Sequence, residues 1–553
     1  MYTAATLMGV NMSYYDLGDY SRALSNATPE AHTWFDRGLI WVFGFNHAEA
    51  IRCFERALSA DPSCALAHWG IAFAVGPHYN QEWDFYAVEE RQQMLDRAHA
   101  ALALGKDAGG SEPEMALIEA LAARYPTDPT LEDFRPFNDA FAAEMRRVHN
   151  LFPDDLDVTS VFVEAMMNRT PWALWDLASG QPAEGADTEE ARRVIENAFD
   201  NLPGAWDHPG LLHLYIHLME MSPWPEKALR HGDRLMTLCP DAGHLVHMAT
   251  HIDVLCGDYQ NVIARNKVAA QVDKAYEAQA GSENFYTVYR IHNIHFIAYG
   301  AMFLGQPTPA LEACAALRDA LPEATVRYLP ELFEAFVAMD RHILVRFGKW
   351  EEILALELPS DTELYCFTTA LTHYARGVAL ANLDRIAEAE AARDAFMAAR
   401  DAVPEDRYMF NNPCAAVLEV AEAMLLGELA YKAARHAEGL EHLRDAVRLD
   451  DGLIYDEPWG WMQPARHALG GLLMDQQHYE EAESVYRADL GLDATLARPC
   501  QHPGNVWALH GLHECLAKRN EDQEINHVRA QLDLAMARSD IEIKASCYCR
   551  ANA

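Results

Sequence analysis

Two histidines and a glutamate follow a helical spacing in the segment HPGLLHLYIHLMEMS. His213, His217 and Glu220 stand at offsets 0, 4 and 7, so a helix would carry all three side chains on one face. Imidazole is the commonest protein ligand for zinc, copper and iron, and two histidines four residues apart can chelate one ion. The spacing therefore predicts a transition-metal site.

Two further segments repeat this pattern. AGHLVHMATHID carries His244, His247 and His251 at offsets 0, 3 and 7, and YRIHNIHF carries two histidines three residues apart. In a stack of helical repeats, alternate helices line one inner surface, so these rows would converge. We predict one or two copper, iron or zinc ions bound by His213, His217, Glu220, His247, His251 and His292. His208, His244 and His295 are second-choice ligands or substrate contacts, and His208 precedes Pro209 at a helix entrance.

Two residues are predicted to act in catalysis. Glu220 is a candidate metal ligand, general base or partner that orients an imidazole. Tyr289 shares the helical face of His292 and could donate a proton to a substrate, although aromatic packing would also explain it. Asn266 and Asp273 lie seven residues apart and could orient imidazoles; ordinary hydrogen bonding between stacked helices is the alternative.

Known catalytic motifs do not match. Leu214 follows His213, so the zinc-peptidase pattern H-E-x-x-H is absent. The order also reverses the Glu-x-x-His of di-iron carboxylate proteins. The chain has no G-x-S-x-G, P-loop or G-x-G-x-x-G motif, which argues against serine hydrolases, nucleotide triphosphatases and Rossmann enzymes. A polar structural seam between helices remains the alternative to a metal site.

Composition narrows the choice of partners. The 553 residues include 83 acidic and 44 basic side chains, a formal charge of −39. Such a surface repels phosphate, so we expect neither nucleic acid nor membrane as a partner. The sequence has no apolar run long enough to span a bilayer, and residues 1–20 lack a signal-peptide pattern. Eleven cysteines without framework spacing suggest reduced thiols in the cytoplasm.

Helical repeats form the framework. Residues 35–76 read as a helix, a Gly/Asn turn, a second helix ending at Asp61-Pro62, and a third helix from near Ala65, which is a tetratricopeptide-like unit. Degenerate copies read as a turn and a second helix at residues 256–270, 347–359, 383–396, 434–450 and 476–490. We predict an all-α, tetratricopeptide-like α-solenoid with N-terminal repeats (1–130), a histidine-rich central region (131–305) and C-terminal repeats (306–553). The aromatic segment 455–467 is interpreted as an inter-repeat loop, with a pocket wall as the alternative.

The chain resembles a widespread family of bacterial and fungal tetratricopeptide-repeat proteins, distantly similar to human tetratricopeptide-repeat protein 38. The resemblance covers nearly the whole chain and rests on segments such as GFNHAEAIRCFERAL, EAMMNRTPWALWD, HPGLLHLYIHLMEMS, AGHLVHMATHID, YRIHNIHF and EPWGWMQPARHALG. It implies an all-α repeat fold and one site containing His213, His217, Glu220, His247, His251 and His292. Ala249 stands where the family usually has Pro, which predicts a less bent helix.

Two functions follow from these patterns. The first is a metal-dependent enzyme that oxidises or hydrolyses a small molecule, in specialised metabolism for example. The second is a non-catalytic scaffold whose groove binds a peptide or protein. Inward-facing histidines favour the enzyme, because scaffold grooves usually present Asn, Lys and Arg. Association with a second copy of the chain stays open.

Overall fold

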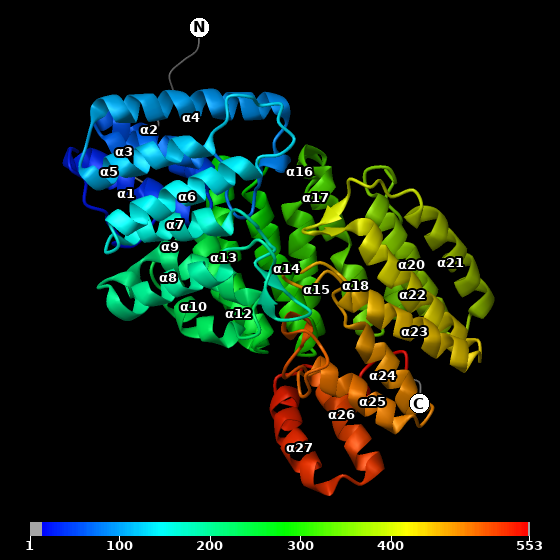
Figure 1. Ribbon diagram of the computed structural model, residues 1–553. Helices are drawn as coiled ribbons and strands as arrows, with labels where there is room; N and C mark the ends of the chain where they lie inside the picture. The colour runs from blue at the N-terminus through cyan, green and yellow to red at the C-terminus, as the bar shows by residue number, and fades with distance from the viewer. Residues whose placement is uncertain (1–13, 551–553) are drawn as a thin grey trace, which may run out of the picture.

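A computed structural model describes residues 14–550, and part of the segment inspected for a leader, residues 1–13, lies outside them. Helices dominate the described chain, and successive helices pack as antiparallel pairs in a curved stack (Figure 1). The predicted all-α, tetratricopeptide-like α-solenoid is confirmed. None of the described helices is both long and apolar enough to cross a membrane.

The N-terminal helices occupy one side of the molecule in Figure 1 and the C-terminal helices the other. The first group comprises α1 (Pro29–Phe43), α2 (His47–Ala60), α3 (Ala65–Ala74), α4 (Val88–Ala108), α5 (Glu112–Leu121), α6 (Arg135–Leu151), α7 (Leu156–Met167) and α8 (Thr188–Asn201). The last group comprises α19 (Trp350–Leu354), α20 (Cys366–Asn382), α21 (Ile386–Arg400), α22 (Cys414–Lys432), α23 (His436–Asp451), α24 (Ala465–Asp475), α25 (Tyr479–Asp489), α26 (Val506–Arg519) and α27 (Asp522–Met536).

The central helices connect these groups along the chain. They are α9 (Pro209–Glu220), α10 (Leu229–Leu235), α11 (Gly243–His247), α12 (Ala249–Leu255), α13 (Tyr259–Ala280), α14 (Thr287–Phe303), α15 (Pro307–Ala320), α16 (Glu323–Tyr328), α17 (Pro330–Phe333) and α18 (Met339–Arg346). Two short hairpins complete the described fold: β1 (Trp175–Asp176) with β2 (Gln181–Pro182), and β3 (Tyr408–Met409) with β4 (Asn412–Pro413).

Glycines let an aromatic ring enter between neighbouring helices of a repeat. A Cβ on Gly38 of α1 or on Gly70 of α3 would lie 2.5–2.6 Å from the Phe54 ring of α2. The same arrangement recurs near the C-terminus, where Gly470 of α24 and Gly511 of α26 flank the Tyr486 ring. The α1–α3 and α24–α26 helices therefore share this way of packing despite their different sequences.

Three local features differ from expectation. The second helix expected in residues 347–359 is the single turn α19, and the chain after it contains Pro359, which disfavours a continued helix. The segment with His244 and His251 is broken at Met248 into α11 and α12 although Pro is absent there. Cys547 and Cys549 form a disulfide, which their Cα separation of 5.2 Å permits, whereas the other nine cysteines are free.

The core does not stop between repeats. One apolar cluster of buried side chains extends from Leu17 to Cys549, with a small satellite around Leu380 and Leu429. The division into three stretches at residues 130 and 305 stays a prediction. The aromatic segment 455–467 is irregular up to α24, and its Trp459 and Trp461 are buried.

Candidate metal centre

The helices that carry the histidine rows alternate with helices that do not. Helices α9, α11–α12 and α14 face inward, while α10 and α13 intervene along the chain. Helix α9 begins at Pro209 because the Nδ1 atom of His208 accepts the N–H of Leu211, 3.1 Å away, and caps the helix. The inward helix faces are fully covered, so the histidines lie in the interior of the molecule.

Three imidazoles meet at their Nε2 atoms. The Nε2 of His251 lies 2.7 Å from Nε2 of His247 and 3.3 Å from Nε2 of His292. We call these three residues the His251 cluster. His247 and His251 are fully buried, and His292 is 8% exposed at the edge of a cavity. Nitrogens bound to one tetrahedral ion lie about 3.3 Å apart when the metal–nitrogen bonds are about 2.0–2.1 Å. The His251–His292 separation matches this value, whereas the shorter His247–His251 separation would have to widen for the two nitrogens to share an ion.

The neighbours of His247 fix where its hydrogen lies. Asn266 of α13 donates its amide hydrogens to the carbonyl of Val262 (2.8 Å) and the hydroxyl of Thr250 (3.1 Å). Its Oδ1 is therefore an acceptor, and His247 Nδ1, 2.6 Å away, must donate to it. The Nε2 of neutral His247 consequently carries a lone pair.

His251 is held by two carboxyl groups. Its Nδ1 lies 2.8 Å from Oε2 of Glu220 and also contacts Oε2 of Glu457. Glu457 in turn accepts the hydroxyl hydrogen of Tyr455. With its Nδ1 hydrogen directed at these oxygens, His251 also presents an Nε2 lone pair. Two lone pairs 2.7 Å apart repel each other, so this contact requires a cation or a proton between the nitrogens.

Burial sets the protonation of these groups. It lowers the pKa of His247 to about 4 and places the pKa values of His251 and His292 well below the usual 6.5. Burial also raises the pKa of Glu457 to about 8, and burial together with the Glu457 carboxyl raises that of Glu220. The imidazoles are thus neutral at pH 7, the form that binds metal, and the two carboxyl groups hold at least one proton between them.

The remaining predicted histidine ligands form a second group. His213 and His217 of α9 lie with His244 of α11, and their ligand atoms are all within 4.8 Å of one another. We call these three residues the His213 cluster. Glu220 connects the two clusters, because its Oε1 contacts Nδ1 of His217 (2.9 Å) while its Oε2 contacts His251. Its carboxylate thus lies behind the imidazoles, on their Nδ1 side.

Other predicted site residues have different surroundings. The ring of Tyr289 packs 4.2 Å from that of His244 and borders the cavity. His208 lies outside both clusters, with Nε2 3.3 Å from Asp157. His295 also lies outside them and packs on Phe336. Asp273 accepts hydrogen bonds from Tyr286 and Asn293 and touches no imidazole of either cluster, which matches the alternative of bonding between stacked helices.

A cavity of about 70 Å³ adjoins the His251 cluster. His244, His251, His292 and Glu457 contribute to its wall, and its other sides are mainly aromatic and apolar: Phe85, Trp172, Phe285, Val288, Leu332 and Phe410. Phe85 is 51% exposed, so the cavity extends from the surface to the imidazoles. The lining thus combines apolar walls with a few imidazole and carboxyl groups.

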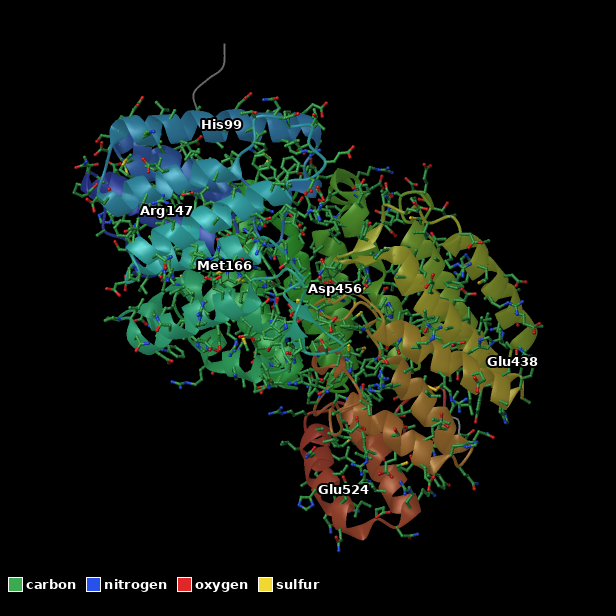
Figure 2. All side chains as sticks on the ribbon, viewed as in Figure 1. His99, Arg147, Met166, Glu438, Asp456 and Glu524 are labelled. Atoms are coloured by element: carbon green, nitrogen blue, oxygen red, sulfur yellow. A yellow bond between two sulfur atoms is a disulfide. The ribbon has the colours of Figure 1, made fainter. Side chains whose placement is uncertain are left out.

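Sequence reasoning missed two contributors. Glu457 lies in the aromatic segment before α24, and Asp456, labelled in Figure 2, marks this segment near the middle of the molecule. Phe410 lies in the β3–β4 turn, and its ring packs 4.9 Å from that of His292. Neither residue has a helical spacing relative to the histidines. For Glu457, the only indication in the sequence was the aromatic segment YDEPWGW that contains it.

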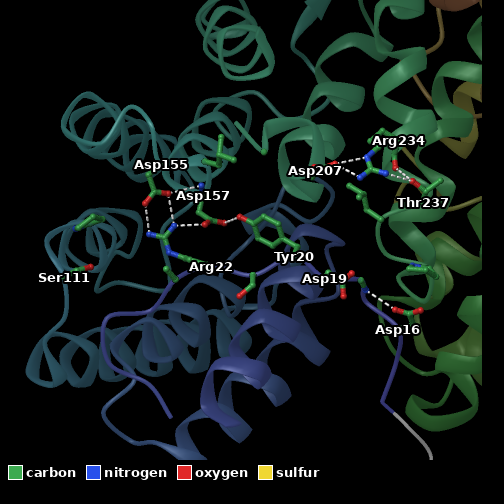
Figure 3. A pocket seen from close by; sticks show the side chains of 18 residues that line it. Asp16, Asp19, Tyr20, Arg22, Ser111, Asp155, Asp157, Asp207, Arg234 and Thr237 are labelled. Carbon is green, nitrogen blue, oxygen red and sulfur yellow. Dashed lines mark hydrogen bonds and ion pairs between the residues drawn. The ribbon is translucent and has the colours of Figure 1, made fainter. Parts of the chain in front are cut away.

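A larger hollow lies elsewhere in the molecule. It measures about 1180 Å³, and its lining includes Asp16, Asp19, Asp155, Asp157 and Asp207 (Figure 3). Its cations are already paired: Arg22 donates to Asp155 and Asp157, and Arg234 donates to Asp207. No imidazole borders it, so it is separate from the candidate metal centre.

Comparisons with known proteins agree with the repeat class. The tetratricopeptide repeat family model matches residues 31–64, so the chain contains such a repeat in α1 and α2. No curated protein matches the chain. The similarity to human tetratricopeptide-repeat protein 38 stays a prediction.

Several solved structures align with most of the chain at low identity and low TM-score. The Cut9–Hcn1 hetero-tetramer of APC/C aligns at 13% identity over 93% of this chain and 77% of that chain, with a TM-score of 0.30. Yeast Tom70 aligns at 10% identity over 91% and 92%, with a TM-score of 0.27. The TPR domain of P58(IPK) aligns at 12% identity over 92% and 98%, with a TM-score of 0.22.

Proposed function

We propose that this tetratricopeptide-repeat protein binds a transition-metal ion at the His251 cluster and acts on a small molecule held in the adjoining cavity. The observation that carries the proposal is the convergence of Nε2 atoms from His247, His251 and His292, with the other nitrogen of two of them committed to Asn266 and to carboxylates. Fixing Nδ1 in this way is how proteins orient metal-binding imidazoles.

The donor set restricts the metal. Three neutral nitrogen donors suit zinc, copper or iron better than magnesium or calcium, which prefer oxygen. Such an ion would supply an open coordination position for activating water or dioxygen. Tyr289 at the cavity wall would contact the substrate, and Glu220 would hold the imidazoles and exchange a proton with Glu457. Hydrolytic and oxidative chemistry both fit this arrangement.

A non-catalytic scaffold is the second candidate. The repeat matched at residues 31–64 favours it, because such arrays commonly bind peptides and proteins. The formal charge of −39 would select a basic partner. Since the histidine-bearing faces are buried, a partner would use the outer surface. The cytoplasm is the proposed location for either function.

Elemental analysis of untagged protein tests the main proposal. We expect stoichiometric zinc, copper or iron, and loss of that ion in His292→Phe, which keeps a ring in the space. His295→Phe is the matched control, because His295 lies on the same helix but outside both clusters. Folded, metal-free protein that also fails to take up added zinc or copper would contradict the proposal and leave the scaffold.

A further inference from the structure

The His213 cluster has the features of a second ligand site. His213 and His244 are each 1% exposed and His217 is fully buried, so solvent does not satisfy their ring nitrogens. Buried polar atoms normally have a hydrogen-bond partner, and leaving one without a partner costs about 1–3 kcal/mol. A cluster of such atoms is therefore a candidate site for a bound ligand or for ordered water.

Hydrogen bonds fix the orientation of two rings. His213 Nδ1 lies 2.6 Å from the carbonyl oxygen of Phe43 and must donate to it, because a carbonyl can only accept. His217 Nδ1 faces Oε1 of Glu220 at 2.9 Å. The Nε2 of His213 then carries a lone pair, and so does the Nε2 of His217 when its Nδ1 donates to Glu220. Neither Nε2 atom has a partner among the described residues.

His244 completes the group from another helix. Neither of its ring nitrogens has a hydrogen-bond partner among residues 14–550. One of these nitrogens lies within 4.8 Å of the ligand atoms of His213 and His217. Three nitrogens at such separations can contract onto one ion whose bonds are about 2.0–2.1 Å long.

Aromatic residues from the N-terminal part of the chain cover this group on the sides away from the cavity. Phe45, in the turn between α1 and α2, places its ring 4.5 Å from that of His213 and 5.7 Å from that of His244. Tyr79 packs 4.8 Å from His217 on another side. Phe45 adopts a φ of 53°, the left-handed conformation, to reach this position. An apolar cover of this kind limits the access of water to the imidazoles.

We propose that the His213 cluster binds a second transition-metal ion, through Nε2 of His213 and His217 and one ring nitrogen of His244. The proposal extends the proposed function, since the protein would then hold two ions. The centres would be neighbours: the rings of His217 and His251 are 5.7 Å apart, and those of His244 and His247 are 6.0 Å apart. Glu220 would orient one imidazole of each centre.

Metal titration tests this without any substitution. Protein stripped with a chelator and refilled with Zn²⁺ or Co²⁺ should saturate at two ions per chain. His244→Phe should then bind one ion, and the ring it retains keeps the packing against Phe45 and Tyr289. Saturation of the wild-type chain at one ion, unchanged in His244→Phe, would overturn the second site.

The two proposals can fail separately. His292→Phe should also reduce the capacity from two ions to one, and the double variant should bind none. If His292→Phe removes the sole ion and His244→Phe has no effect, only the second site is wrong. If His244→Phe removes the sole ion and His292→Phe has no effect, the proposed function is wrong and the second site stands. If His244→Phe fails to fold, the number of ions at which the wild-type chain saturates still distinguishes one metal site from two.

Discussion

Asn266 donates both of its amide hydrogens to protein acceptors, so its Oδ1 is left to receive the Nδ1 hydrogen of His247. This single side chain determines which nitrogen of His247 faces His251. The Nδ1 of His213 is likewise oriented by a backbone carbonyl, and the Nδ1 of His251 is oriented by carboxyl groups. The ring nitrogens are therefore ordered by ordinary hydrogen-bond chemistry before any ligand arrives.

Replacing Asn266 should weaken metal binding. Asn266→Leu removes the acceptor for His247, and loss of such a partner typically lowers metal affinity about 10- to 100-fold. Asn266→Asp keeps an acceptor oxygen and should retain more of the affinity. Competition with a chromophoric chelator measures both variants. Equal affinities for wild type and Asn266→Leu would show that Asn266 does not position a ligand.

Buried histidines outside the centre affect stability. His342 is fully buried against Trp461, and burial lowers its pKa to about 3. Between pH 6.5 and 3 the unfolded chain therefore binds a proton at this site that the folded chain does not, so His342 lowers stability as pH falls. Buried carboxyls act in the opposite direction: burial raises the pKa of Asp450 to about 7. The pH dependence of the unfolding free energy sums the effects of both kinds of group. Substituting His342 isolates the contribution of this one residue.

His342→Phe should gain stability relative to wild type as the solution is acidified. The unfolding free energies of the two proteins should diverge by about 2 kcal/mol between pH 7.5 and pH 5, in favour of the variant. Urea unfolding at both pH values, with chelator present, measures this difference. A difference independent of pH would mean that His342 is protonated alike in the folded and unfolded chain.

The residues of the two clusters illustrate what spacing can predict. Offsets of three, four and seven place histidines on one helical face, and the structure brings His247, His251 and His292 together. The division into two clusters, and the place of His244 beside His213, depend on how α9 and α11 pack and were not available from spacing. Whether either cluster holds metal stays a prediction.

Helix pairing depends on glycines that face aromatic rings. A Cβ on Gly470 would lie 2.6 Å from the Tyr486 ring, which is buried and cannot move aside. The adjacent Gly471 meets nothing nearer than 3.3 Å, at the Ser546 hydroxyl. Both glycines lie in α24, so the two positions share helix propensity and differ in their packing.

Gly470→Ala should destabilise the C-terminal repeat by about 1–3 kcal/mol, the usual cost of overpacking a core. Gly471→Ala should be close to neutral, because the helix propensity of alanine offsets the mild crowding. Chemical denaturation followed by the far-ultraviolet circular dichroism of both variants provides the comparison. Equal stabilities would contradict the interlocked packing of α24, α25 and α26.

Regular elements were more predictable than irregular ones. The ends of α2 follow from Asn46 as its N-cap and from Asp61-Pro62 after it, and the sequence marks both. The break at Met248 and the reduction of α19 to one turn were not predicted, because tertiary packing decides them. Glu457 could not be placed either, since it reaches His251 from 206 residues away along the chain, in a segment without periodicity.

At the scale of the whole molecule, metal binding should stabilise the fold. The two clusters connect α9, α11, α12 and α14, so an ion bound there joins helices that are separate in the sequence. A ligand present at 100 times its dissociation constant stabilises the folded state by about 2.7 kcal/mol. Chelation should therefore lower the thermal midpoint, and the effect should be smaller in His292→Phe. An unchanged midpoint in wild type would contradict this prediction.

The overall class followed from pattern alone, because a repeat of helix, turn and helix has few ways to bury its apolar faces other than stacking. The solenoid does not present its histidine rows to an open groove, however. Aromatic residues from the N-terminal repeat and the β3–β4 turn, Phe45 and Phe410, cover them. Phe45 and Phe410 reach the histidines through the packing of distant parts of the stack, which the spacing of residues within one helix cannot predict.

Anomalous X-ray diffraction from crystals of untagged protein tests the central claim most directly. Data collected on both sides of the zinc, copper and iron absorption edges should give a peak about 2.0–2.1 Å from Nε2 of His247, His251 and His292. The contradictory result is a map without any anomalous peak there, with Nε2 of His247 and His251 joined by a hydrogen bond.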